Sequence, residues 1–248
     1  MLRLAPFLAV FVLAGPVIAG LAGTLGPAMG YMPALGFHGL DAEPLRMLLA
    51  TPGLHVMCLL SVTTGLAATA IALLITTLFT AGWQGTRAFA ALRRVLSPLL
   101  AVPHAAAAFG LAFLIAPSGW VSRLISPDLS GWERPPDALI VNDGLGMTLL
   151  AGLVVKEVPF LFLVTLAALG QADATRGRRL AASLGYGRVR GWLLSVFPSV
   201  YRQIRLPVLA TLAFSASVVD MAIVLGPTTP PTLAVRIVEW TSDPDLAM

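Results

Sequence analysis

Three ionisable residues lie inside long apolar stretches of the sequence, where they could bind a solute, relay protons or hold helices together. Lys156 and Glu157 are adjacent and close to Pro159, and Asp220 lies in a later apolar stretch. A lone charge at the centre of a bilayer costs on the order of 2.5 to 3.5 kcal/mol on insertion scales, so such residues need partners. We therefore expect a buried ion pair between Lys156 and Asp220. Glu157 is then expected to face a translocation path or a second subunit.

Two interpretations of this group stay open, a translocation path with a gate and the packing of neighbouring helices, and the second is favoured. His104 follows Pro103 in a stretch of small residues. A histidine there could titrate near neutral pH, but it is more often a hydrogen-bonded packing residue. The candidates for a path or for packing are Lys156, Glu157, Asp220 and His104.

Other kinds of chemistry have no support in the sequence. It has no G-x-x-x-x-G-K-[ST] motif that would hold nucleotide phosphates. The single Cys58 excludes a disulfide within the chain, and neither His38 nor His55 lies at metal-ligand spacing from it. We expect no catalytic residue, no metal and no cofactor in this chain.

Composition explains why the ionisable residues are so few. The chain has 248 residues, of which 57% are hydrophobic and 11% charged, and its mean hydropathy is +0.86. Soluble domains have roughly 25% charged and about 45–50% apolar residues. The composition therefore excludes a soluble globular fold and predicts one all-α integral membrane domain over residues 1–248.

Five segments are long and apolar enough to cross a bilayer, which takes roughly 20 residues. They lie near residues 4–26, 55–80, 95–116, 144–169 and 206–226. The first segment fits either a signal peptide or a signal anchor, and the anchor is favoured because the apolar run continues past any cleavage point. A sixth helix is missing at the C-terminal end. We expect that the sequence stops before a final span or is part of a longer polypeptide, although an odd number of helices is also open.

The charges between these segments are strongly biased in sign. If the N-terminus is cytoplasmic, the inner loops and end contain eleven arginines and one acid, and the outer loops and end contain four arginines and nine acids. This bias is typical of the positive-inside rule. The basic residues therefore indicate topology, a multi-pass protein with a cytoplasmic N-terminus, and do not indicate a nucleic-acid partner.

The longest inner loop, 170–205, has the pattern of two short helices separated by glycines. Asp173 can cap a helix that ends at Gly185, and a second amphipathic piece runs through Trp192 into Pro198. Such a pair would lie along the membrane surface with its arginines outside, and it would form a protrusion to which a soluble partner could bind.

This loop resembles the EAA loop in permease subunits of binding-protein-dependent ABC importers, whose pattern is Glu-Ala-Ala, three residues, Gly, nine residues, then Ile-x-Leu-Pro. Ala181, Gly185 and Pro198 match the second Ala, the Gly and the Pro. Arg179, Leu180 and Ser195 stand where the pattern has Glu, the first Ala and Ile. Any salt bridge that the family's Glu makes is therefore lost or reversed here.

The resemblance extends over a core from about residue 55 to 248, because SVTTGLAATAIALL and LLAVPHAAAAFGLAFLIAPSGW precede the loop in the family's order. It implies a MetI-like, type I importer permease in the bacterial inner membrane. The nearest type is the thiamine, iron(III), sulfate and polyamine importers, in which two permease halves often share one chain, so this chain resembles a subunit or an N-terminal half.

In such an importer the permease moves a small solute by alternating access and performs no catalysis itself. The resemblance implies an ATPase dimer that holds ATP and Mg, a periplasmic solute-binding protein, surrounding lipid and a second permease half, which is the same chain, a copy or a paralogue. The residues implied to couple to the ATPase are Arg179, Leu180, Ala181, Ser183, Leu184, Gly185 and Pro198.

Three other interpretations stay open. An ion-coupled secondary transporter would use Lys156, Glu157 and Asp220 as a relay, and a membrane-embedded enzyme would use Glu157 and His104. The loop could also be a solvated basic connector. The spacing in the loop argues against the first two, and the solute is not determined by the sequence.

Overall fold

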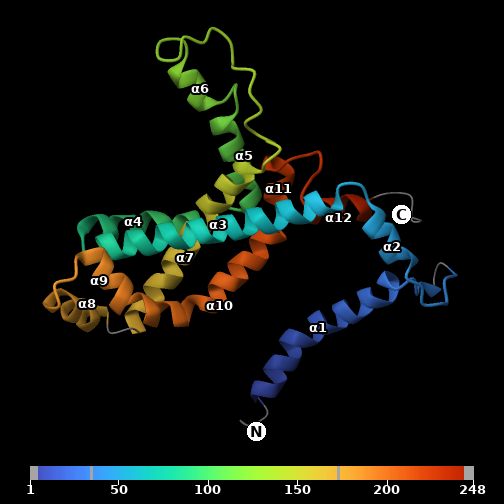
Figure 1. Cartoon of the computed structure of the whole chain (residues 1–248), viewed down its shortest axis with the longest axis horizontal. Helices are drawn as coiled ribbons and strands as arrows, with labels where there is room; N and C mark the ends of the chain where they lie inside the picture. The colour runs from blue at the N-terminus through green and yellow to red at the C-terminus, as the bar shows by residue number, and fades with distance from the viewer. Residues whose placement is uncertain (1–4, 34–35, 172–173, 243–248) are drawn as a thin grey trace. The chain divides into compact units, whose positions relative to one another are not determined.

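Helices form all the regular secondary structure in the part of the chain that the computed structural model describes, which is every residue except 1–4, 34–35, 172–173 and 243–248 (Figure 1). One isolated β-bridge joins Met32 and Phe37. The prediction of an all-α protein is therefore confirmed for these residues. The chain divides into two units, Met1–Leu54 and His55–Met248, and each is described by itself.

The first unit contains α1 (Ala5–Ala28) and α2 (Glu43–Ala50). The apolar side chains of α1 are exposed on all sides, as Phe7, Phe11 and Leu13 show at 75% exposure each. A helix that is hydrophobic all round suits a membrane. After α1 the chain turns back, and the Asp41 N–H donates to the Met29 carbonyl at 2.8 Å.

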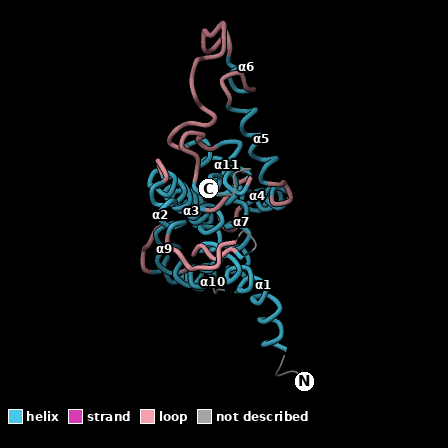
Figure 2. Tube along the Cα trace, turned by 90° about the vertical axis from the view of Figure 1, so that its right-hand side faces the viewer, coloured by secondary structure: helices cyan, strands magenta, loops and turns pink. Residues whose placement is uncertain are grey.

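The second unit contains ten of the described helices. They are α3 (Leu54–Trp83), α4 (Arg87–Leu99), α5 (His104–Ile115), α6 (Trp120–Ile125), α7 (Met147–Gln171), α8 (Ala174–Ser183), α9 (Arg188–Ser195), α10 (Phe197–Ala216), α11 (Asp220–Leu225) and α12 (Leu233–Thr241). The helices α8 and α9 lie near the Trp83 end of α3, and α11 and α12 lie near its Leu54 end (Figure 1). The tube view shows α5 and α6 at one end of this unit and α9 and α10 towards the other (Figure 2).

Four helical stretches among the described residues are long and apolar enough to cross a membrane: Pro6–Ala28, Leu54–Trp83, His104–Ile125 and Met147–Gln171. The first, second and fourth agree with predicted spans to within a few residues. The total of five spans stays a prediction.

Two predicted spans differ from the structure in their helix boundaries. The predicted span 95–116 is interrupted after α4, and α5 begins only at His104, because Pro103 has no N–H and disfavours a helical conformation in the residue before it. The predicted span 206–226 is divided between α10 and α11, which are separated at Ser217–Val219. Hydropathy alone does not detect either break.

The helices of the second unit enclose two apolar clusters. The Trp192 cluster consists of Ala72, Ala81, Leu161, Ala168, Ala174, Trp192, Val196, Val200, Ile204 and Val208. The Met221 cluster consists of Ala68, Ala108, Leu149, Leu153, Val218, Met221, Ala222, Leu225 and Val235. Both clusters contain residues of α3 and α7. These two helices therefore connect the α8–α9 end of the unit to its α11–α12 end.

Small residues let the helices approach closely. A Cβ added at Gly65 of α3 would lie 2.8 Å from the Ala216 backbone nitrogen of α10, and one added at Gly152 of α7 would lie 2.6 Å from Leu225 Cδ1 of α11. Such close backbone approach is typical of helix packing in membranes.

Polar side chains fix the junction between the start of α7 and the end of α11. The two carboxylate oxygens of Asp143 accept hydrogen bonds from the backbone N–H groups of Met147 and Thr148, each at 2.8 Å. The Asn142 Nδ2 donates to the carbonyls of Val224 (3.3 Å) and Gly226 (2.8 Å). These bonds satisfy backbone groups that helix ends leave without partners.

We predict that Asp143→Ala destabilises the second unit, because two N–H groups at the start of α7 lose their acceptors. The free energy of unfolding in detergent should fall by about 0.5 to 2 kcal/mol. Asp137→Ala removes an exposed acid from the same loop and is the control, with an expected change within about 0.5 kcal/mol. An equal loss in both variants would contradict this role of Asp143.

Candidate functional site

The pair α8 and α9 is a helical hairpin whose turn is set by one glycine. Gly185 has a φ of +80°, a conformation that glycine adopts without a steric penalty. The Tyr186 N–H donates to the Ala181 carbonyl and the Gly185 N–H donates to the Ala182 carbonyl, each at 3.0 Å. This is the Schellman pattern of helix termination. The prediction that the helix stops at Gly185 is confirmed.

Small residues bring α8 and α9 into contact. A Cβ added at Gly191 of α9 would lie 3.0 Å from the Cβ of Ala181, which is 5% exposed. A Cβ added at Gly177 would lie 3.4 Å from the Ser195 carbonyl oxygen. The alanine that matches the family pattern is thus a packing residue, since a larger side chain there would separate the two helices.

Hydrogen bonds to Gln84 attach this hairpin to the end of α3. The Trp192 Nε1 donates to Gln84 Oε1 at 2.9 Å, and Arg188 Nη2 donates to the Gln84 backbone carbonyl at 2.7 Å. Trp192 itself is 1% exposed within its cluster. Both packing and polar contacts therefore hold α9 against the end of α3.

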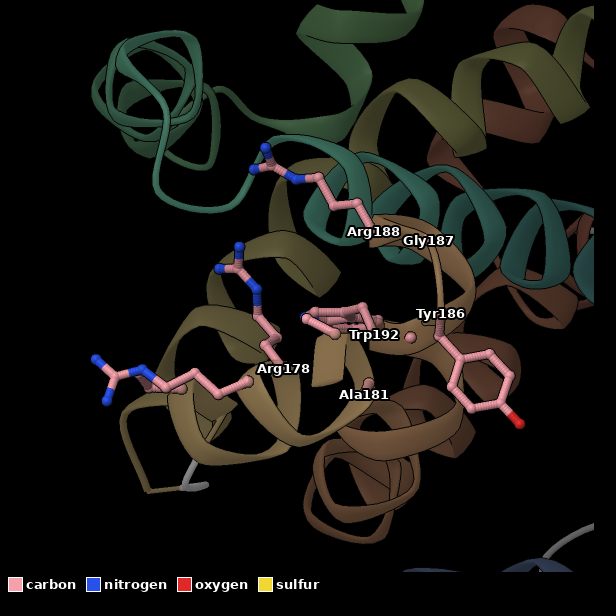
Figure 3. A pocket seen from close by; sticks show the side chains of 10 residues that line it. Arg178, Ala181, Tyr186, Gly187, Arg188 and Trp192 are labelled. Carbon is pink, nitrogen blue, oxygen red and sulfur yellow. The ribbon is translucent and has the colours of Figure 1, made fainter. Parts of the chain in front are cut away.

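Other side chains of the hairpin are exposed, and they include leucines and arginines. Leu180 and Leu184 are 61% and 68% exposed, and Arg179 and Ser183 are also exposed. A pocket of about 510 Å³ opens between the two helices (Figure 3). Its lining consists of Thr175, Arg178, Arg179, Ala181, Ala182, Tyr186, Gly187, Arg188, Gly191 and Trp192.

The structure brings together most of the residues predicted to couple to an ATPase. Arg179, Leu180, Ala181, Ser183, Leu184 and Gly185 belong to α8 and its turn, whereas Pro198 lies in the first turn of α10. Proline suits that place because the first N–H groups of a helix have no partner within the helix. The predicted cap Asp173 lies outside the described residues.

Gln84 and Gly191 are not among the residues predicted from the sequence to hold this hairpin together. Gln84 lies 108 residues before Trp192 in the sequence, and no local pattern relates them. The small residues of α8 repeat four apart at Gly177 and Ala181, a spacing that places them on one face. That spacing was the available signal for a closely packed partner helix.

The intramembrane charges have partners other than those expected. Lys156 Nζ donates to the backbone carbonyls of Leu99 (3.2 Å) and Val102 (2.6 Å). The expected ion pair with Asp220 is wrong, since the ion pairs among the described residues are Arg46–Glu43 and Arg236–Glu239. The reason is the break after α4, which leaves carbonyls free of helical hydrogen bonds beside the ammonium group.

Glu157 and His104 each contact α10. Glu157 is 4% exposed, and its Oε1 accepts a hydrogen bond from the Ser215 hydroxyl. The His104 ring lies 4.8 Å from the Phe214 ring, centroid to centroid. Asp220 Oδ1 accepts from the Met221 N–H at 2.9 Å. These contacts favour helix packing over the relay that an ion-coupled carrier would need.

Among the described residues no group of three or more His, Cys, Asp or Glu side chains could hold a metal ion.

The chain is similar in sequence to a bacterial inner membrane protein. The chain is 38% identical over 150 residues to the inner membrane ABC transporter permease protein YnjC of Escherichia coli (strain K12). The match covers 60% of this chain but only 27% of that protein, so the chain spans well under two thirds of its relative. No protein-family model matches the chain. With the four membrane-length helices, this similarity supports a multi-pass inner membrane protein.

We predict that Gly191→Leu separates α8 from α9, because the new side chain would meet the Ala181 methyl group. Trypsin should then cleave after the α8 arginines faster than in the unchanged protein in detergent. The control is Gly187→Leu, since Gly187 has open space for a Cβ and an extended backbone with φ −63° and ψ 162°. Equal cleavage rates in the two variants would contradict the close contact.

A double-mutant cycle distinguishes the observed partners from the expected ion pair. For Lys156→Met combined with Asp220→Asn, we expect additive changes in the free energy of unfolding, within about 0.5 kcal/mol. For Glu157→Gln combined with Ser215→Ala, we expect a coupling of about 0.5 to 3 kcal/mol because the two side chains share a hydrogen bond. A larger coupling energy for Lys156 and Asp220 than for Glu157 and Ser215 would support the ion pair that the sequence predicts.

Proposed function

We propose that this chain is a permease subunit, or one half of a fused permease, of a binding-protein-dependent ABC importer. It moves a small solute across the inner membrane by alternating access, and a separate ATPase supplies the energy. Its similarity to an inner membrane ABC transporter permease protein supports this proposal. The sequence resemblance of residues 170–205 to the EAA loop also supports it.

The observation that carries the proposal is the hairpin α8–α9 with its exposed face. Leu180 and Leu184 are apolar side chains on a surface that the arginines otherwise make polar. Apolar residues rimmed by polar ones typically mark a protein interaction surface. The other face is fixed to α3 by Trp192 and to α10 by the short link at Val196. A partner that moves the exposed face therefore moves the membrane helices.

Packing explains how such a movement reaches the membrane. The Trp192 cluster joins α8 and α9 to α3, α7 and α10, and protein interiors are packed too tightly to absorb a displacement locally. In the proposed cycle, closure of the ATPase pair displaces the hairpin, and the connected helices change their tilt together. Rigid-body shifts of this kind are a recurrent mode of switching.

The remaining parts of the proposal follow the resemblance. The hairpin and its arginines lie in the cytoplasm, where the positive-inside rule places them. The partners are an ATPase dimer that binds ATP and Mg, a second permease half, a periplasmic solute-binding protein and the surrounding lipid. The thiamine, iron(III), sulfate and polyamine type of importer stays a prediction.

The test is co-purification in detergent with candidate ABC ATPase subunits. We expect an ATPase to bind the intact chain and to bind Leu184→Asp at least about tenfold more weakly, because burial of one leucine is worth roughly 1.5 to 3 kcal/mol. The control is Leu129→Asp, since Leu129 is 82% exposed in the loop after α6. If no ATPase binds, or if both variants bind alike, the coupling proposal fails.

A further inference from the structure

The pocket between α8 and α9 has cationic walls and an apolar floor. Arg178, Arg179 and Arg188 line it from the two helices, and Ala181 and Trp192 lie at its base. Figure 3 shows the side chains of Arg178 and Arg188 on the same side of Trp192, with Tyr186 on the other side. No carboxylate lines the pocket in the part of the chain that the structure describes.

The three arginines are not neutralised by the described residues. The only ion pairs found there, Arg46–Glu43 and Arg236–Glu239, lie in other helices. Arg188 donates to the neutral carbonyl of Gln84, which positions its guanidinium group without cancelling the charge. Arg178 is half-buried, so its charge is less hydrated than that of a free surface arginine. An anion in this pocket would gain both electrostatic attraction and hydrogen bonds.

We propose that the pocket receives the carboxylate of an aspartate or glutamate on the surface of the ATPase subunit. This inference rests on the proposed function, and it specifies that the ATPase surface at this point is negatively charged. A guanidinium group binds a planar carboxylate through two parallel hydrogen bonds. The apolar floor at Ala181 and Trp192 suits the methylene groups that precede a side-chain carboxylate. Charge complementarity thus selects an acidic protein side chain as the occupant.

The proposal divides the interface into two parts with different salt dependence. Leu180 and Leu184 contribute by apolar burial, which moderate salt does not screen. The arginines contribute by charge. Salt weakens the attraction between exposed charges, with a screening length of about 8 Å at physiological ionic strength. Binding of the ATPase should therefore weaken with added sodium chloride, and that salt dependence should disappear when the pocket arginines are neutralised.

Cross-linking tests this directly, because the chain has a single lysine. Lys156 is 7% exposed and bound to two carbonyls, so it gives little background. A carbodiimide condenses an amine and a touching carboxylate into an amide. Arg178→Lys and Arg179→Lys are each expected to form such a link to the ATPase subunit that co-purifies with the intact chain, and mass spectrometry identifies the acidic residue. The matched control is Arg202→Lys, an exposed position on α10.

Affinity measurements provide the second readout. At low salt, Arg178→Gln with Arg179→Gln should weaken ATPase binding by about tenfold or more, and Arg202→Gln should leave it within about twofold. At high salt the double variant and the intact chain should bind the ATPase with similar affinity.

Each other outcome overturns the inference. If the ATPase binds but neither lysine variant cross-links above Arg202→Lys, or if the double Gln variant binds normally, the pocket does not receive a partner carboxylate although the proposed function stands. If the double variant instead loses only its binding to phosphatidylglycerol vesicles, the occupant is a lipid headgroup. If no ATPase binds at all, the inference fails together with the proposed function.

Discussion

The apolar cluster that α3, α7 and α10 share is the constraint on which the rest of the second unit depends. Gly65 brings the backbones of α3 and α10 into contact at Ala216, and α3 and α7 both contribute to the Trp192 and Met221 clusters. The two ends of the unit are therefore connected by helices that belong to both clusters.

Two adjacent charged residues of α7 lie between the two apolar clusters. They form hydrogen bonds with residues near the ends of α4 and α10, where these helices are interrupted. Lys156 binds the carbonyls that follow the end of α4, and Glu157 binds Ser215 just before α10 ends. In an apolar environment every polar group must find its partner within the protein. The break after α4 and the Lys156 ammonium group thus satisfy each other, whereas Glu157 pairs only Oε1 and its Oε2 is buried without a hydrogen-bond partner among the described residues.

The hairpin α8–α9 connects this interior to a surface that a partner can recognise. Gly177, Ala181 and Gly191 remove side-chain volume from its inner face, so the two helices form one body attached to Gln84. Leucines and arginines are exposed elsewhere on its surface. The same short segment therefore combines an attachment to the membrane helices with exposed apolar and cationic side chains, as the proposed coupling to an ATPase requires.

Much of this architecture could be predicted from the sequence, because hydropathy and helix-stop signals are local. Three of the membrane helices, the two helices of the 170–205 loop and the turn at Gly185 follow from runs of apolar residues and from the conformational freedom of glycine. Only the tertiary structure decided the partners of Lys156, Glu157 and Trp192. These partners lie 54 to 108 residues away in the sequence, and they include backbone carbonyls at a helix break that residue types do not reveal. Hydropathy specifies which segments enter the membrane, whereas the helix breaks and close contacts that place each polar group arise from packing.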